Sequence, residues 1–139
     1  MQAPPLPPKL SAPPFELLGG EAPVRALVER FYDEMERLEP ALAALHERDA
    51  EGRVARGARD RFALFLIGWL GGPQTYTERH GHPRLRMRHG KVAVDARMRD
   101  AWTRSMSAAL DGAAITGELR AFLDARFAEV ADFLRNQPG

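Results

Sequence analysis

The sequence predicts an all-α fold, because its apolar residues recur at steps of three and four and do not alternate strictly. Four such stretches are separated by glycines and prolines, which end helices and form turns. At 139 residues, the chain matches one domain and is long enough to enclose a core. We therefore expect a single helical unit, with no internal repeat.

The first 14 residues differ from the rest of the chain. They contain six prolines and almost no apolar periodicity, a composition that favours extended polyproline conformations and cannot build a core. We expect a flexible proline-rich tail over residues 1–14 and one folded domain over residues 15–139. Docking of the tail on a partner's aromatic groove is the alternative interpretation.

The first long helix is expected from Glu21 to about Leu38. Its apolar residues form one stripe at helical spacing: Val24, Leu27, Val28, Phe31, Met35 and Leu38. Tyr32 lies beside this stripe, where its ring can be buried while its hydroxyl meets a polar partner. A proline then ends the helix, and the short turn that follows carries His46.

The second long helix becomes apolar near Phe62. Before it, residues 47–58 are charged and rich in alanine, so a helix there would be mostly exposed. From this point apolar residues occupy most sides: Phe62, Leu64, Phe65, Leu66, Ile67, Trp69 and Leu70. Such a helix is buried on most of its faces. Glycines and a proline at residues 71–73 end it.

A long polar segment, residues 74–94, follows, and only short helical pieces are expected in it. A loop of this length in a compact domain is uncommon unless it is functional. It holds a group of basic residues: His80, His82, Arg84, Arg86, Arg88 and His89. Asp95 is a suitable N-cap for the next helix, whose apolar face includes Trp102. A last amphipathic helix starts near Gly117.

Composition excludes several classes of protein. The absence of cysteine removes disulfides, cysteine-based zinc sites and thiol catalysis. A net charge of +1 produces no overall field that demands a nucleic acid or a membrane as partner. No apolar run approaches the roughly 18 residues that span a bilayer, and the N-terminus lacks the pattern of a secretory signal. We expect a cytoplasmic protein without nucleic-acid or membrane partners.

His89 carries the functional hypothesis. It lies between two apolar helices at the end of the arginine-rich segment, and Leu85 precedes it by one helical turn. A histidine in this position is either a structural residue or the axial ligand of a buried cofactor. Haem matches the second interpretation, because it is an apolar disc whose iron accepts a neutral imidazole. The neighbouring arginines would then pair with its carboxylates.

Other chemistry has less support in the sequence. His80 and His82 form an H-x-H pair near His89, but a zinc site needs three or four convergent ligands at a recognised spacing. Neither a nucleophile elbow nor a glycine-rich phosphate loop is present. Tyr32 and Trp102 are either core aromatics with hydrogen-bonded tips or donors directed at a ligand of the iron.

Several motifs resemble those of one protein family. FLIGWLGGP (residues 65–73), GHP (81–83) and LRMRH (85–89) resemble the truncated haemoglobins, and among them the bacterial second group, the oxygen-binding type. Residues 19–35 and 99–102 resemble the same group, and the likeness runs in order from about residue 15 to the end. This resemblance implies a two-over-two helical globin that encloses haem b.

The resemblance also implies a role for each matching residue. His89 matches the proximal ligand of the haem iron. The residues that match the distal, ligand-facing positions are Tyr32, His46, Ala58 and Trp102. The residues that match haem contacts are Phe62, Phe65, Leu66 and Leu85 on the apolar faces, and Arg61, Tyr76 and Arg88 at the propionates.

The distal residues suggest how the pocket is used. Each hydrogen bond to dioxygen would contribute roughly 1 kcal/mol, so Tyr32, Trp102 and His46 together would contribute about 3 kcal/mol. Release of dioxygen would then slow about a hundredfold. Slow release suits retention of dioxygen for a reaction with nitric oxide, or reduction of a peroxide, better than transport.

Other functions remain open at this point. Oxygen storage or transport, and gas sensing through a partner protein, would use the same pocket, whereas a haem-free helical interaction module would not. The sequence contains no flavin or reductase domain, so enzymatic turnover would need an external reductase. The oligomeric state is not encoded in a recognisable motif, and a homodimer is compatible with the sequence.

Overall fold

The computed structural model describes residues 10–81 and 95–134, and its regular structure is helical. The helices are α1 (Pro14–Leu18), α2 (Glu21–Leu38), α3 (Pro40–Ala43), α4 (Arg56–Trp69), α5 (Thr75–His80), α7 (Ala96–Gly112) and α8 (Gly117–Leu134). Within those two ranges, strand-like pairing is limited to one isolated bridge, between Arg48 and Val54. The predicted all-α fold class is confirmed.

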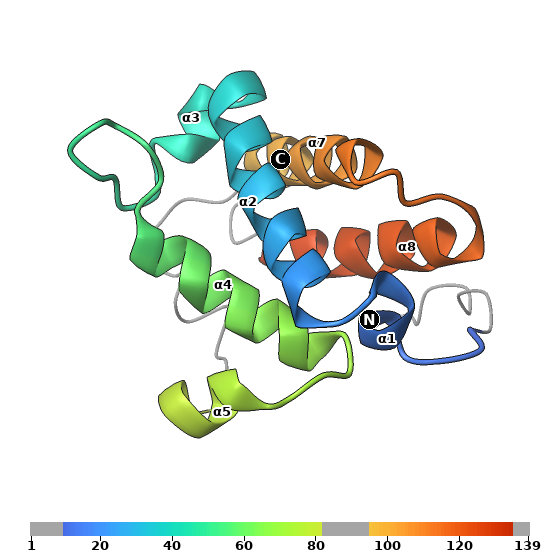
Figure 1. Cartoon of the computed structure of the whole chain (residues 1–139). Coiled ribbons are helices and arrows are strands. Elements are labelled where there is room, and N and C mark those ends of the chain that lie inside the picture. The colour runs from blue at the N-terminus through green and yellow to red at the C-terminus, as the bar shows by residue number, and fades with distance from the viewer. Residues whose placement is uncertain (1–9, 82–94, 135–139) are drawn as a thin grey trace.

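The long helices of the described part of the chain form two pairs, α2 with α4 and α7 with α8 (Figure 1). α2 lies at the centre, with α4 on one side and α7 on the other. The short α1 and α3 adjoin the two ends of α2. No helix in these ranges is both long and apolar enough to cross a membrane. The core therefore forms around α2.

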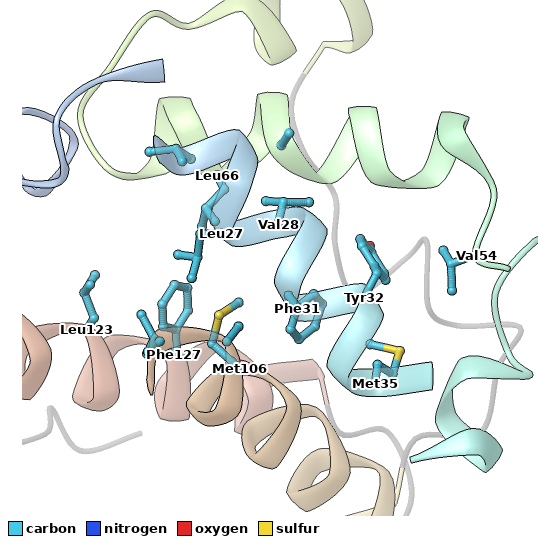
Figure 2. Packing of buried hydrophobic residues seen from close by; sticks show 14 of the residues in the cluster. Leu27, Val28, Phe31, Tyr32, Met35, Val54, Leu66, Met106, Leu123 and Phe127 are labelled. Atoms are coloured by element: carbon cyan, nitrogen blue, oxygen red, sulfur yellow. The ribbon is translucent and has the colours of Figure 1, made fainter. Parts of the chain in front are cut away.

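The apolar stripe of α2 supplies the centre of the core. The following members of the stripe are buried: Val24, Leu27, Val28, Phe31 and Met35. Figure 2 shows Leu66 of α4 on one side of this stripe and Met106 and Phe127 of the other helix pair on the opposite side. Leu38, which was expected in the same stripe, is 41% exposed because the helix ends at this residue.

The N-terminal segment of the described chain packs against the glycines that follow α4. Gly71 has a φ of +100°, a left-handed conformation that favours glycine. A Cβ on Gly72 would lie 2.7 Å from Cδ1 of Phe15 and 2.9 Å from the carbonyl oxygen of Ile67. The amide of Phe15 donates to the carbonyl oxygen of Leu70 at 2.9 Å. The helix α1 is thus attached to the end of α4.

The segment between α2 and α4 differs from expectation in two places. The turn expected after Pro40 contains a short helix, α3, with the proline at its first turn, where its missing amide costs little. Residues 47–55 are irregular and mostly exposed, yet Val54 is buried. Its amide donates to Oε2 of Glu36 at 2.6 Å, so this acid of α2 turns the segment toward the core.

The start of α7 agrees with the prediction. The Asp95 side chain accepts a hydrogen bond from the amide of Met98 at 3.0 Å, which makes it the N-cap. On the predicted apolar face, the hydroxyl of Ser105 is buried and donates to the carbonyl oxygen of Ala101 at 2.9 Å. The polar group is therefore satisfied inside the helix, and Trp102 packs against the core beside it.

Candidate functional site

Three helices bring the expected ligand-facing aromatic residues together. The ring centre of Phe62, on α4, lies 5.9 Å from that of Tyr32, on α2, and 6.4 Å from that of Trp102, on α7. Phe31 contacts all three rings, at centre distances of 5.0 to Tyr32, 5.3 to Phe62 and 5.2 Å to Trp102. We call these four residues the aromatic cluster. It joins residues that are far apart in the sequence, from Phe31 to Trp102.

The aromatic cluster carries two hydrogen-bond donors, the hydroxyl of Tyr32 and the indole N–H of Trp102. Neither donor has a hydrogen-bond acceptor among the described residues. Every fully buried polar side-chain atom in those residues has a partner, so these two unpaired donors are not fully buried and face accessible space. Burial raises the pKa of Tyr32 well above its usual value of 10.0, so the hydroxyl keeps its proton at neutral pH. The cluster can therefore donate two hydrogen bonds to a polar molecule in this space.

His46 lies next to the aromatic cluster, just after α3. Its ring centre is 5.6 Å from that of Tyr32, and the two rings meet edge to face. Its Nδ1 is 3.0 Å from the carbonyl oxygen of Leu42. A carbonyl oxygen only accepts, so Nδ1 carries a proton, and the neutral ring then has an unprotonated Nε2. His46 is half-buried and thus adjoins both the cluster and the surface.

Ala58 and Arg61 lie in the first turns of α4. Ala58 is half-buried, packs against the main core and precedes Phe62 by one helical turn, so the two share a face of the helix. Arg61 is exposed, so its guanidinium can meet an anionic group at the surface.

Phe65 and Tyr76 form a second buried cluster together with Leu64. The ring centres of Phe65 and Tyr76 are 5.9 Å apart, and Phe62 stacks on Phe65 at 6.3 Å. Phe62 therefore connects the second cluster to the aromatic cluster. Leu66, which was expected on the same wall, is 0% exposed and belongs to the main core.

Three of the expected site residues lie outside the described residues: Leu85, Arg88 and His89. The proximal iron ligand and part of the propionate contacts therefore remain predictions from the sequence. The described chain stops just before them, at Gly81 after α5, and resumes at Asp95 before α7.

Arg59 is a neighbour of the site that the sequence did not single out. It is 4% exposed, and its guanidinium carbon lies 5.5 Å from the centre of the Tyr32 ring. Its sequence surroundings are charged, which is typical of a solvated helix. Its acidic partners are 23 to 30 residues away in sequence, so spacing within one helix could not reveal its burial.

The described residues fit a haem cofactor. Haem needs apolar walls for its disc and polar donors for a diatomic ligand on its iron. The two clusters joined through Phe62 supply aromatic walls, and Tyr32 and Trp102 supply donors that have no acceptor among the described residues.

Comparison with known proteins places the chain in one family. The family model for bacterial-like globins matches residues 14–136. The group 2 truncated haemoglobin YjbI of Bacillus subtilis is 36% identical over 124 residues, which cover 89% of each chain.

Two solved structures have the same fold. The group II 2-on-2 haemoglobin of Agrobacterium tumefaciens has a TM-score of 0.82 and 34% identity, covering 94% of this chain and 98% of that one. The truncated oxygen-avid haemoglobin of Bacillus subtilis has a TM-score of 0.80 and 34% identity, covering 90% of this chain and all of that one (100%). The chain belongs to the bacterial-like globin family and is a group II truncated haemoglobin with the 2-on-2 helical fold.

Proposed function

We propose that this truncated haemoglobin retains dioxygen through tight distal hydrogen bonds and uses it in redox chemistry with nitric oxide, or reduces a peroxide in the same pocket. As a member of its family, the chain binds haem and small diatomic ligands. The observation that carries the proposal is the pair of donors on Tyr32 and Trp102, which have no acceptor among the described residues. When bound, haem supplies the iron that holds the ligand and exchanges electrons with it.

The number of donors determines how much the release of a bound ligand is slowed. A neutral hydrogen bond contributes about 1 kcal/mol, so Tyr32 and Trp102 together contribute about 2 kcal/mol to a bound polar ligand. That amount slows release about thirtyfold relative to a pocket without donors. A related haemoglobin of Bacillus subtilis is described as oxygen-avid, which supports the same behaviour here.

Retained dioxygen suits chemistry that ends in a stable product. One dioxygen, one nitric oxide and one electron give one nitrate, so each cycle needs an electron from outside the protein. Reduction of hydrogen peroxide to two waters takes two electrons and two protons. In both cases, we propose an external reductase as the partner and the cytoplasm as the location. The protonated hydroxyl of Tyr32 holds the oxygen ligand by donation in either reaction.

The remaining haem contacts are assigned through the matching motifs. We propose His89 as the proximal ligand, Phe62, Phe65, Leu66 and Leu85 as apolar contacts, and Arg61, Tyr76 and Arg88 as propionate contacts. The distal side consists of Tyr32, Trp102, His46 and Ala58. Phe65 is buried against Tyr76 on the α4–α5 side, which supports an apolar contact and a propionate contact next to each other there.

The test compares the wild-type protein with Tyr32→Phe, both loaded with haem. Release of dioxygen is timed by displacement with carbon monoxide, and nitrate is counted after the oxygenated protein is mixed with nitric oxide. We expect about fivefold faster release from the variant, and one nitrate per haem from the wild type. Equally fast release from both proteins, with no nitrate formed, would instead indicate an oxygen carrier. A protein that takes up no haem would exclude every function proposed here.

A further inference from the structure

Arg59 is held in place by acceptor atoms of four residues on two other segments of the chain. Its Nε donates to the carbonyl oxygen of Val54 at 2.9 Å. Its Nη1 donates to Oε1 of Glu29 and to Oδ1 of Asp33, both at 3.0 Å. Its Nη2 donates to Oε2 of Glu36 at 3.2 Å. A buried arginine with this many acceptors has one defined position, because its planar fork matches each of them at once.

The same guanidinium lies over the ring of Tyr32, with its carbon 5.5 Å from the ring centre. Tyr32 sits on α2 between the acids that hold Arg59, three residues after Glu29 and four before Glu36. A cation over an aromatic face is attracted to it, more strongly where both are shielded from water. Tyr32 is 5% exposed, so the contact is shielded and restrains the orientation of its ring.

Arg59 also fixes the helix that carries the opposite wall of the aromatic cluster. It belongs to the first turn of α4, where its amide donates to the carbonyl oxygen of Ala55 at 3.2 Å. Phe62 follows it by three residues on the same helix. The bonds from Arg59 to α2 therefore join the turn of α4 that precedes Phe62 to the helix that carries Tyr32, and the rings of Tyr32 and Phe62 are 5.9 Å apart.

Two exposed arginines share the same acids but not the contact with the ring. Arg53 pairs with Asp33 and Glu36, and Arg56 pairs with Glu29. These outer pairs can keep α2 and the start of α4 together without Arg59. Only Arg59, among the arginines of the described chain, has its guanidinium over Tyr32. Loss of Arg59 should therefore free the orientation of the Tyr32 ring, while the outer pairs still hold α2 and the start of α4 together.

We propose that Arg59 is a positioning residue for ligand retention, which holds the Tyr32 hydroxyl toward the ligand without touching the ligand itself. This role rests on the proposed function, in which Tyr32 donates a hydrogen bond to the bound ligand.

The experiment combines substitutions at the two positions in the haem-loaded protein. Arg59→Met keeps the approximate length of the side chain and removes the positive charge. Arg59→Lys keeps the positive charge and removes the planar guanidinium with its several donors. Arg53→Met is the matched control, because it removes a cation from the same acids but not from the ring. Each is made with Tyr32 intact and with Tyr32→Phe. The readouts are the rate of dioxygen release and the infrared stretch of bound carbon monoxide, which reports hydrogen-bond donation.

With Tyr32 intact, we expect Arg59→Met to speed release about fivefold and to shift the carbon monoxide stretch in the direction that Tyr32→Phe shifts it. In the Tyr32→Phe background, the same substitution should change neither value, since residues that act through one contact are not additive. Arg53→Met should leave both values unchanged in both backgrounds. Arg59→Lys should fall between Arg59→Met and wild type, which keeps the test informative if Arg59→Met does not fold.

A haem-independent readout completes the test. The chain has only two tyrosines, so ring-labelled tyrosine gives two sets of NMR signals, and Tyr76→Phe identifies those of Tyr32. Arg59→Met should shift the Tyr32 signals in the haem-free protein, and Arg53→Met should not. Equal acceleration of release by Arg59→Met in both tyrosine backgrounds would overturn the positioning role. If Tyr32→Phe alone leaves release unchanged, the proposed function fails instead.

Discussion

Nδ1 of His46 lies 3.0 Å from the carbonyl oxygen of Leu42, the residue four positions before it. When the ring is neutral, this hydrogen bond uses its only N–H, so Nε2 of the neutral ring is an acceptor. Tyr32 and Trp102 are donors at every physiological pH. The three polar residues in or next to the aromatic cluster therefore differ in whether they can donate a hydrogen bond to an oxygen ligand or accept one from it.

Replacement of His46 should have a smaller effect than replacement of Tyr32. At pH 8, we expect His46→Leu to change the rate of dioxygen release less than about threefold, because no donated hydrogen bond is lost, whereas Tyr32→Phe speeds it about fivefold. Stopped-flow displacement with carbon monoxide measures both rates. Acceleration by His46→Leu at pH 8 as large as that by Tyr32→Phe would show that His46 donates to the ligand after all.

Trp102→Phe keeps an aromatic ring against Phe31 and removes the indole N–H. Release of dioxygen should become about fivefold faster, and the double variant with Tyr32→Phe about thirtyfold faster if the two donors act independently. Trp69→Phe is the control, because Trp69 stacks on Phe127 at 5.3 Å and lies outside the aromatic cluster. A rate as fast in Trp69→Phe as in Trp102→Phe would point to general loosening of the core.

Burial of Tyr32 makes the protein sensitive to alkali. Its pKa is raised in the folded state mainly by burial, while in the unfolded chain it stays near 10.0. The unfolded state therefore loses the proton first, and the free energy of unfolding falls as the pH rises above about 10. Urea unfolding of the wild type and of Tyr32→Phe at pH 9 and 11 should show the smaller loss in the variant, by up to about 1 kcal/mol. Equal losses would contradict this.

Two glycines should respond to alanine in opposite directions. Gly72→Ala places a methyl group 2.7 Å from Phe15 and 2.9 Å from a carbonyl oxygen, so we expect destabilisation by about 1–3 kcal/mol. Gly57→Ala, on an exposed position of α4 whose nearest atom is 3.4 Å away on Arg61, should stabilise by about 0.5 kcal/mol. Thermal unfolding of both variants measures the difference. A neutral Gly72→Ala would mean that the N-terminal segment moves away readily.

The helical framework could be predicted from local patterns. α2 runs from Glu21 to Leu38 as the apolar periodicity indicated, and Asp95 caps α7 as its residue type suggested. Both features depend on residues within a few turns of one another. The convergence of Tyr32 and Trp102 on Phe62 was expected only through the resemblance to a family, since no periodicity relates three separate helices.

The burial of Arg59 could not be predicted in this way. An arginine in a charged, alanine-rich stretch is usually exposed, because desolvating a cation is costly unless several acceptors replace water. Those acceptors come from one face of α2, at Glu29, Asp33 and Glu36. The attachment of Phe15 to the end of α4 likewise depends on a long-range contact, here with Leu70.

The acids of α2 pair with both exposed and buried arginines, so the contact between α2 and the start of α4, here called the α2–α4 joint, contains ion pairs that respond differently to ionic strength. At 0.15 M salt, the screening length is about 8 Å, so the exposed pairs of Arg53 and Arg56 weaken as salt is added. The pairs of the buried Arg59 are screened much less. Added salt should therefore lower the overall stability of the α2–α4 joint while the spacing between Tyr32 and Phe62 is kept. Ligand kinetics would then stay constant over a range of ionic conditions in which the fold itself becomes easier to open.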